Sequence, residues 1–152
     1  GLRRYNDSFA ERNTNFFTLG PRVDYRALDW LTLTLTYLYE RGLADGHKDT
    51  QFADDVSYYL HMVSAGTEVR INRQWDLGFT YIHRRKTFTS GLAGDTHVGR
   101  FDATHQGIAE LRYHMSAAAT VMLSFQYGKR TSTNALRDFQ DSIFSIGGQY
   151  RF

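Results

Sequence analysis

The chain of 152 residues contains no cysteine, so neither disulfide bonds nor thiolate metal sites can form within it. It also has no apolar run near the roughly 18 to 20 residues that a membrane-spanning helix requires. An excess of one charge is lacking as well, because 18 basic and 16 acidic residues leave a net charge of +2. No long basic run offsets this balance, so we expect no nucleic-acid partner. The length fits a single domain over residues 1–152.

What the chain does contain is a strict alternation of apolar and polar residues. Residues 31–36 read Leu-Thr-Leu-Thr-Leu-Thr, and a helix would spread these leucines around its whole circumference. Threonine is also β-branched and favours strands. Pro21 has no N–H for a ladder, which indicates an edge or a bulge where it occurs. The period of two predicts seven strands, at 16–27, 31–40, 56–71, 75–82, 106–114, 119–128 and 142–152, and a stub at 2–5 would make an eighth.

Short turns and long loops alternate between these strands. The short turns fall near residues 28, 73 and 116, and the long loops fall near residues 10, 48, 95 and 135. This alternation is typical of an antiparallel meander whose two ends face different compartments. The sequence therefore predicts an all-β, antiparallel up-and-down sheet.

The alternation alone leaves open whether the apolar rows face a protein core or lipid. A soluble all-β fold would bury these rows and leave the polar rows as its surface. A membrane barrel would turn them outward, and their length of about five alternate positions is near the 9 to 11 residues of a strand that crosses a bilayer. The abundance of aromatic residues, at 15%, and of glycine, with 13 residues against one proline, also favours a barrel.

Aromatic residues gather at both ends of the apolar rows, where a membrane would have its two interfaces. The short-turn end carries Tyr25, Trp30, Trp75, Tyr113, Tyr150 and Phe152. The long-loop end carries Phe17, Tyr37, Tyr39, Tyr59, Tyr81 and Tyr127. The polar rows hold both signs of charge, which suits a lumen wall on which neighbouring strands pair their ions. We expect this lumen to be lined by Arg22, Asp24, Arg26, Glu68, Arg70, Asp76, Glu110, Arg112, His114, Gln126 and Arg151.

The last strand ends with Tyr150 two residues before a terminal Phe152. This ending resembles the assembly signal of Gram-negative outer-membrane β-barrels, and the strand rhythm and aromatic girdles are similar to that class. The resemblance implies a porin-like transmembrane β-barrel in the bacterial outer membrane, with short turns and carboxy terminus periplasmic and long loops extracellular. Its partners would be outer-membrane lipid, lipopolysaccharide, the barrel-assembly machinery and a periplasmic or surface protein. Because bacterial barrels are usually even-stranded, seven strands and a stub suggest the carboxy-terminal section of a larger barrel.

The width of the barrel decides its function. A large barrel would line water with its charged residues, and we expect a pore, conduit or scaffold for transport with no chemistry of its own. A closed barrel of about eight strands has room only for side chains. Its ions would then form a plug, and the protein would act as a membrane anchor or adhesin through its long loops. A lipid-modifying or proteolytic barrel enzyme is a third reading, because such sites assemble from distant strands.

No local motif supports catalysis or metal binding. The six histidines lack ligand spacing, and the serines lack a nucleophile elbow. Asp45, Asp49, Asp54 and Asp55 depart from the calcium-loop pattern. We therefore expect no catalytic residue, no cofactor and no metal site. Cations expected in loops could meet lipopolysaccharide phosphates, and they are Lys48, Arg84, Arg85, Lys86, Arg100, Lys129, Arg130 and Arg137.

Overall fold

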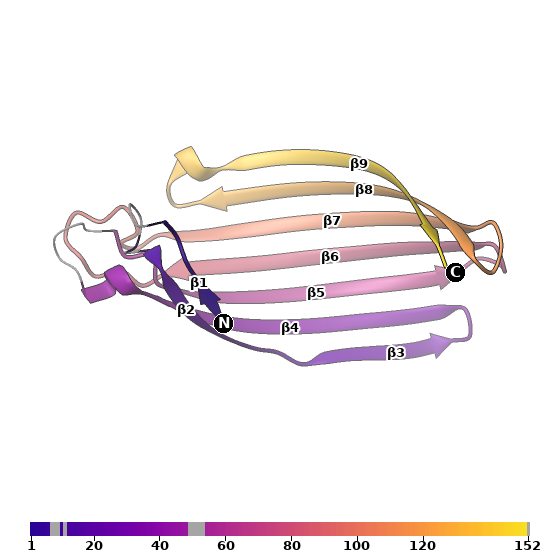
Figure 1. Ribbon diagram of the computed structural model, residues 1–152, viewed down its shortest axis with the longest axis horizontal. Helices are drawn as coiled ribbons and strands as arrows, with labels where there is room; N and C mark the ends of the chain where they lie inside the picture. Colours follow the sequence, from indigo (N-terminus) through magenta and orange to yellow (C-terminus); the bar gives the residue numbers. More distant parts are fainter. Residues whose placement is uncertain (7–9, 11, 49–53, 152) are drawn as a thin grey trace.

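The fold is one antiparallel sheet, seen in a computed structural model that describes residues 1–6, 10, 12–48 and 54–151 (Figure 1). The sheet has nine strands in the order β1-β2-β4-β5-β6-β7-β8-β9, and β3 pairs with β4 beside β2. The predicted all-β up-and-down arrangement is confirmed. The elements are β1 (Leu2–Arg3), β2 (Thr14–Leu19), β3 (Arg22–Leu28), β4 (Leu31–Ala44), η2 (Asp45–Lys48), β5 (Tyr58–Arg70), β6 (Trp75–Phe88), β7 (Phe101–His114), β8 (Ala119–Ser132), η3 (Ala135–Arg137) and β9 (Phe139–Tyr150).

The three short turns lie where the sequence predicted them, and side-chain oxygens shape two of them. In the turn at 71–74, Asn72 Oδ1 accepts the backbone N–H groups of Gln74 and Trp75 at 2.8 and 3.0 Å. In the turn at 115–118, Ser116 Oγ accepts those of Ala118 and Ala119 at 3.2 and 3.1 Å. Where the chain reverses, these side-chain oxygens accept backbone N–H groups that have no partner in the ladder of the sheet.

The strands run further toward the long loops than the alternation predicted. β6 continues to Phe88 and β7 begins at Phe101, so the predicted loop at 84–104 shrinks to 89–100. Likewise β8 extends to Ser132. These extensions carry polar residues on both faces, which hides the period of two, while the backbone ladder pairs them regardless of polarity.

The first predicted strand is interrupted at 20–21, where Pro21 indicated a bulge or an edge. β2 and β3 both pair with β4, and between them the N–H of Tyr37 still donates to the Pro21 carbonyl at 3.0 Å. A Cβ at Gly20 would collide with the carbonyl oxygen of Tyr37, so this close approach requires glycine. The stub at 2–5 forms only Leu2–Arg3, which pairs with β2.

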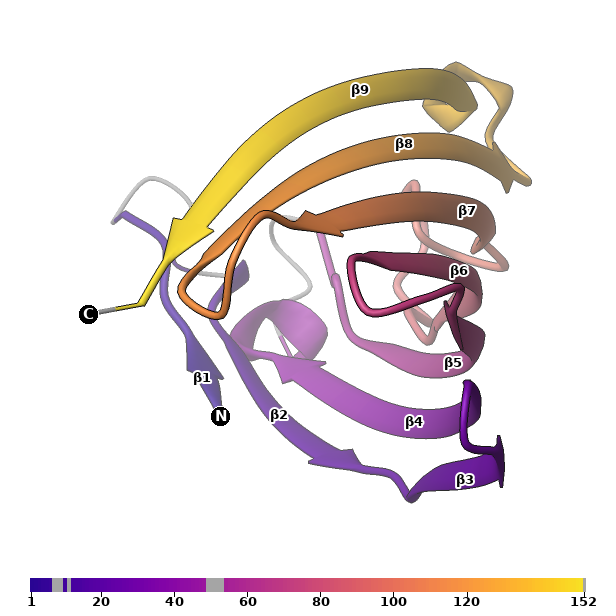
Figure 2. The same ribbon diagram turned by 90° about the vertical axis from the view of Figure 1, so that its right-hand side faces the viewer.

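The sheet curls into a trough (Figure 2). Its concave face is polar and its convex face is apolar. Threonine, serine and charged residues line the concave side. The convex side exposes the apolar rows, with Leu35 at 54%, Phe79 at 51% and Phe144 at 70% exposure. Across the part of the chain that the structure describes, the trough is open: β9 forms one edge, and β1 and β3 lie at the other.

The sheet has almost no apolar core. Among the described residues, the buried hydrophobic ones are Ala44, Tyr58 and Phe88, all near the long loops. The apolar rows therefore face away from the protein, which is the arrangement that the sequence left undecided. Within the described ranges, no helix is long and apolar enough to cross a membrane.

Candidate functional site

The concave face holds a polar cavity of about 360 Å³ that extends from β3 to β7. Hydroxyl groups of β4 and β5 line much of it, among them those of Thr34 and Ser64. Its charged lining residues are Arg22, Glu68, Glu110 and Arg112, all four of which were predicted to line a lumen.

Arg112 links two carboxylates that come from different strands. It forms ion pairs with Glu110 on its own strand and, at 3.3 Å, with Glu68 on β5. Strand β6 lies between these carboxylates, and its residue at that level is Gly78, in register with both of them. Because Gly78 has no side chain, the guanidinium of Arg112 can reach across β6. The cavity wall is thus lined by paired ions.

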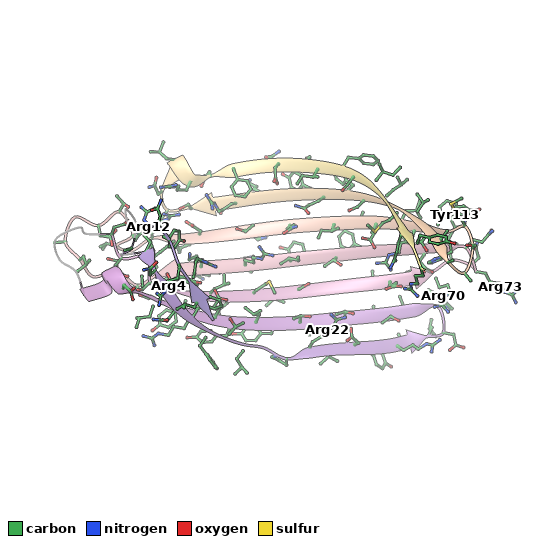
Figure 3. The ribbon with its side chains drawn as sticks, viewed as in Figure 1. Arg4, Arg12, Arg22, Arg70, Arg73 and Tyr113 are labelled. Atoms are coloured by element: carbon green, nitrogen blue, oxygen red, sulfur yellow. The ribbon has the colours of Figure 1, made fainter. Side chains whose placement is uncertain are left out.

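A second group of ions lies nearer the short turns. His114 Nε2 is 2.8 Å from Asp76 Oδ2, and Arg70 Nε is 3.9 Å from Asp76 Oδ1. The other imidazole nitrogen of His114 bonds the Thr120 hydroxyl at 3.0 Å. Three strands, β6, β7 and β8, thus share one hydrogen-bonded group, and β5 adds Arg70 from its end (Figure 3).

The remaining predicted lumen residues lie on the same side of the sheet but form smaller groups. On β3, Arg22 pairs with Asp24 at 2.8 Å, and Asp24 also accepts a bond from Thr34 on β4. Arg26 pairs with Asp29 in the first turn at 3.5 Å. Gln126 lies in register with Ile108, which lines the cavity.

The two assembly-signal residues are only partly placed. Tyr150 lies at the end of β9, on the convex side, with 63% of its surface exposed. Arg151 follows it, and its backbone N–H donates to the Ala118 carbonyl at 2.9 Å. Phe152 lies outside the described residues.

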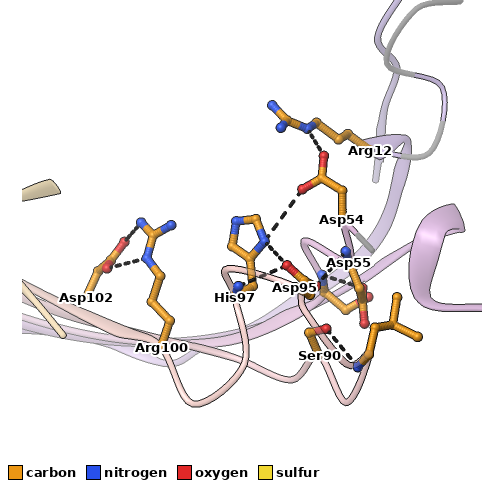
Figure 4. A network of polar contacts seen from close by, with 10 residues as sticks. Arg12, Asp54, Asp55, Ser90, Asp95, His97, Arg100 and Asp102 are labelled. Carbon is orange, nitrogen blue, oxygen red and sulfur yellow. Dashed lines mark hydrogen bonds and ion pairs between the residues drawn. The ribbon is translucent and has the colours of Figure 1, made fainter. Parts of the chain in front are cut away.

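A largely buried cluster, which no sequence motif indicated, joins three of the long loops (Figure 4). His97 Nδ1 lies 2.9 Å from Asp95 in its own loop and 3.6 Å from Asp54 in the loop before β5. Asp54 also pairs with Arg12, at 2.5 Å. The nearest signal in the sequence was the acidic content of the loop around Asp54, but nothing in that loop indicates a partner more than 40 residues away.

The hydrogen bonds around Asp95 stabilise its ionised form. Burial opposes that ionisation, but bonds from the Ser90 hydroxyl and from the backbone N–H groups of His97 and Asp55 outweigh it. The pKa of Asp95 therefore lies below its usual value. Because the Asp55 N–H comes from the other loop, at 2.9 Å, this one carboxylate fastens the two loops together.

The same cluster has the composition of a metal site. Ligand atoms of Asp54, Asp95 and His97 all lie within 4.8 Å of one another, and carboxylate with imidazole suits zinc and related ions. In the geometry described, those atoms already bond one another and Arg12. These bonds explain the arrangement of the cluster, which holds the loops together, and we call it the loop clamp. Of the other acidic candidates, Asp55 accepts the Ser57 N–H, and Asp49 lies outside the described residues.

The convex face carries a row of tyrosine–histidine pairs at the long-loop end of the apolar rows. Tyr37 bonds His61 Nδ1 at 2.8 Å, and Tyr81 bonds His105 Nδ1 at 2.6 Å. His83 lies directly across from His105, with ring centroids 4.6 Å apart. The sequence shows no ligand spacing among these histidines. Their positions on either side of the predicted loop at 84–104 were the signal that His83 and His105 would pair.

The cations beyond this row separate onto two faces. The prediction that Arg84, Arg85 and Lys86 lie together in a loop is wrong, because all three belong to β6. Arg85 shares the convex side with His83, and its guanidinium lies 5.1 Å from the Phe101 ring. Arg84 and Lys86 belong to the other side, because successive strand residues point in opposite directions.

Comparison with protein-family models, with curated proteins and with solved structures gives no match to this chain. The class of protein is therefore defined by the fold alone. Over the described residues it is an all-β antiparallel sheet of nine strands with a polar concave face and an exposed apolar convex face.

Proposed function

We propose that the chain forms part of a transmembrane β-barrel in a bacterial outer membrane and serves as a conduit for solutes. The observation that carries this proposal is the orientation of the sheet, with apolar rows exposed on the convex face and ions on the concave face. In water, so large an exposed apolar surface would be unfavourable, since each buried Å² is worth about 25 cal/mol. Lipid would cover it without that cost.

The proposal requires the open edges of the sheet to be paired. Unpaired backbone groups cost several kcal/mol each in hydrocarbon, so membrane barrels are closed. The outer edges of β3 and β9 would therefore join further strands, as in a barrel wider than this sheet. In such a barrel the concave face would line a water-filled passage.

The orientation in the membrane follows from the two kinds of connection. The short turns would face the periplasm and the long loops the exterior, as is usual for such barrels. Tyr150 at the short-turn end would then belong to the signal read by the barrel-assembly machinery. On the convex side, Arg85 and the tyrosine–histidine row would lie at the level of lipopolysaccharide phosphates.

The first experiment is conductance of the full-length protein in a planar bilayer, together with a variant that disturbs the passage. Gly78→Val places a branched side chain between Glu68 and Glu110, while the Cβ itself would meet Glu110 Cβ only at an ordinary 3.7 Å. We expect open channels in the unmodified protein and an altered reversal potential in a salt gradient for this variant. The conduit is refuted if the folded protein inserts but never conducts, which would favour a plugged anchor instead.

Gly107→Val is the matched control for that measurement. Gly107 lies on the convex side of β7, and a Cβ there would meet nothing within 4 Å. The control therefore adds the same side chain to the sheet without entering the cavity, and its reversal potential should equal that of the unmodified protein.

A further inference from the structure

A second cavity, of about 230 Å³, lies at the long-loop end of the trough. β1, β5 and β6 contribute to it, together with residues of the loops before β2 and β7. No carboxylate is among its described lining residues, although the chain as a whole is nearly balanced in charge. Its cations are Arg3, Arg12, Lys86, Arg100 and Arg137.

Two of these cations form ion pairs with carboxylates that do not line the cavity. Arg100 forms two hydrogen bonds with Asp102, at 3.0 and 2.6 Å, and both side chains are buried. Arg12 pairs with Asp54. Within the described chain, Arg3 and Lys86 have no carboxylate within ion-pair distance, so positive charge remains facing the cavity.

Lys86 lies at the centre of this positive charge. Its Nζ lies 3.8 Å from the ring centroid of Tyr58 and 4.6 Å from that of Phe88, two of the few buried aromatic side chains. Two carboxylates act on Lys86 without lining the cavity or reaching ion-pair distance: Asp102, in register with it on β7, and Glu40, which accepts the Tyr58 hydroxyl at 2.5 Å. Aromatic faces attract a cation but do not neutralise it.

The surroundings disfavour the charged form of Lys86, which lies beyond the apolar rows of the sheet. Burial and then the positive charge of Arg3 lower its pKa to about 8, although Asp102 opposes the shift. A bound anion would favour the charged form of Lys86 again. Its negative charge would compensate for the burial of the ammonium group and would weaken the repulsion between that group and the neighbouring guanidinium groups.

We infer that this cavity is a binding site for a small oxyanion of the phosphate type, held by Lys86 and Arg3. Guanidinium groups bind such oxygens through paired N–H donors, and Lys86 adds a point charge. The β5 and β6 residues that line the cavity belong to the concave side of the sheet, so its ligand would be a free solute rather than the phosphate of a lipid on the convex side. The inference does not depend on transport and stands if the conduit proposal fails.

The test is calorimetric titration of the full-length protein in a zwitterionic detergent with inorganic phosphate. We expect saturable binding that weakens at least tenfold in Lys86→Gln. Lys129→Gln is the matched control, because Lys129 lies near the same end of β8 on the convex side. Equal binding by the unmodified protein and Lys86→Gln would overturn the inference, and so would equal weakening by Lys129→Gln. Should Lys86→Gln fail to fold, Arg3→Gln on the exposed β1 carries the same expectation.

Two further measurements test whether Lys86 binds the anion and whether the ligand is a free anion or a lipid. Sulfate has the same charge throughout the range from pH 6.5 to 9.5, so its affinity should fall above about pH 8 as Lys86 loses its proton. A flat profile would exclude Lys86 as a ligand. The Lys86→Gln variant should bind vesicles that contain phosphatidic acid as well as the unmodified protein does. If the substitution weakened only this binding to vesicles, the cavity would be assigned to lipid phosphate instead.

Discussion

At the scale of single residues, Asp95 has the clearest role. It is buried, accepts backbone N–H groups from two loops and contacts His97. A carboxylate with this many donors is stabilised in its ionised form, and its removal would leave those buried donors unsatisfied. The loops around it are therefore held by one titratable group.

The stability of this loop clamp should depend on acid. Because the pKa of Asp95 is below its usual 3.8 in the folded chain, its contribution is complete above pH 3.8 and declines as the pH falls toward the folded pKa. Hydrogen exchange of the His97 and Asp55 amides should therefore be slow at pH 5 and faster, relative to the intrinsic rate, near pH 2.5. Asp95→Asn should lower local protection by about 1–3 kcal/mol at pH 7. Unchanged protection in Asp95→Asn would contradict the clamp.

The sequence could not identify this cluster, because the fold creates it. Asp54 and His97 are separated by strands β5 and β6, and only the hairpin between them brings their loops together. By contrast, charged residues inside predicted strands could be assigned to one face from parity alone. Even there, the contact between Arg112 and Glu68 depends on Gly78, whose importance appears only once the register is known.

At the scale of the element, β6 shows how one strand serves two environments. Arg84 and Arg85 are adjacent in sequence but point to opposite sides of the sheet. They therefore form a matched pair in which the change in charge is the same and only the face differs.

Charge reversal at each of these two arginines should distinguish contact with lipid on the convex side from contact with the trough on the concave side. We expect Arg85→Glu to weaken lipopolysaccharide binding about tenfold, because in the proposed membrane orientation it would place a carboxylate beside the lipid phosphates. Arg84→Glu should leave that affinity unchanged. Binding can be followed by co-purification of lipopolysaccharide with the detergent-solubilised protein. Equal losses in both variants would show that the convex side has no special part in lipid binding.

Strand positions were predictable because packing on one face imposes a period of two, as in residues 31–36. The ends of the strands were not predictable, since β6 and β7 continue through polar residues whose pairing depends on the backbone of the neighbouring strands. The break at Gly20 and Pro21 was half predicted: proline indicated an irregularity, while the collision that requires glycine depends on the position of Tyr37.

At the scale of the whole molecule, the two faces should respond in opposite ways to charge. Leu35→Arg places a cation on the convex face and should cost about 2–4 kcal/mol in lipid if it lies near the bilayer midplane. Thr34→Arg points into the trough, where Asp24 already bonds Thr34, and should be tolerated. Folding yield into lipid vesicles, measured by the heat-dependent shift in gel mobility, compares the two. A larger loss for Thr34→Arg would mean that the convex face does not meet lipid.

The circumference of a closed barrel was the global feature that the sequence could not supply. Alternation specifies which side of each strand is apolar, and turn lengths specify the up-and-down order, but neither specifies whether the sheet closes or how many strands a closed sheet would have. The curvature of the trough also depends on twist accumulated over all strands, not on any single segment.

The side-chain-capped turns at Asn72 and Ser116 also have a kinetic consequence. Each closes a hairpin between strands adjacent in sequence, so the loops that must close during folding are short and their entropic cost is small. Hairpins β5–β6 and β7–β8 can therefore each form from the turn end, in microseconds rather than seconds. The slower step would be the pairing of β6 with β7, because the connection between them, at 89–100, is much longer.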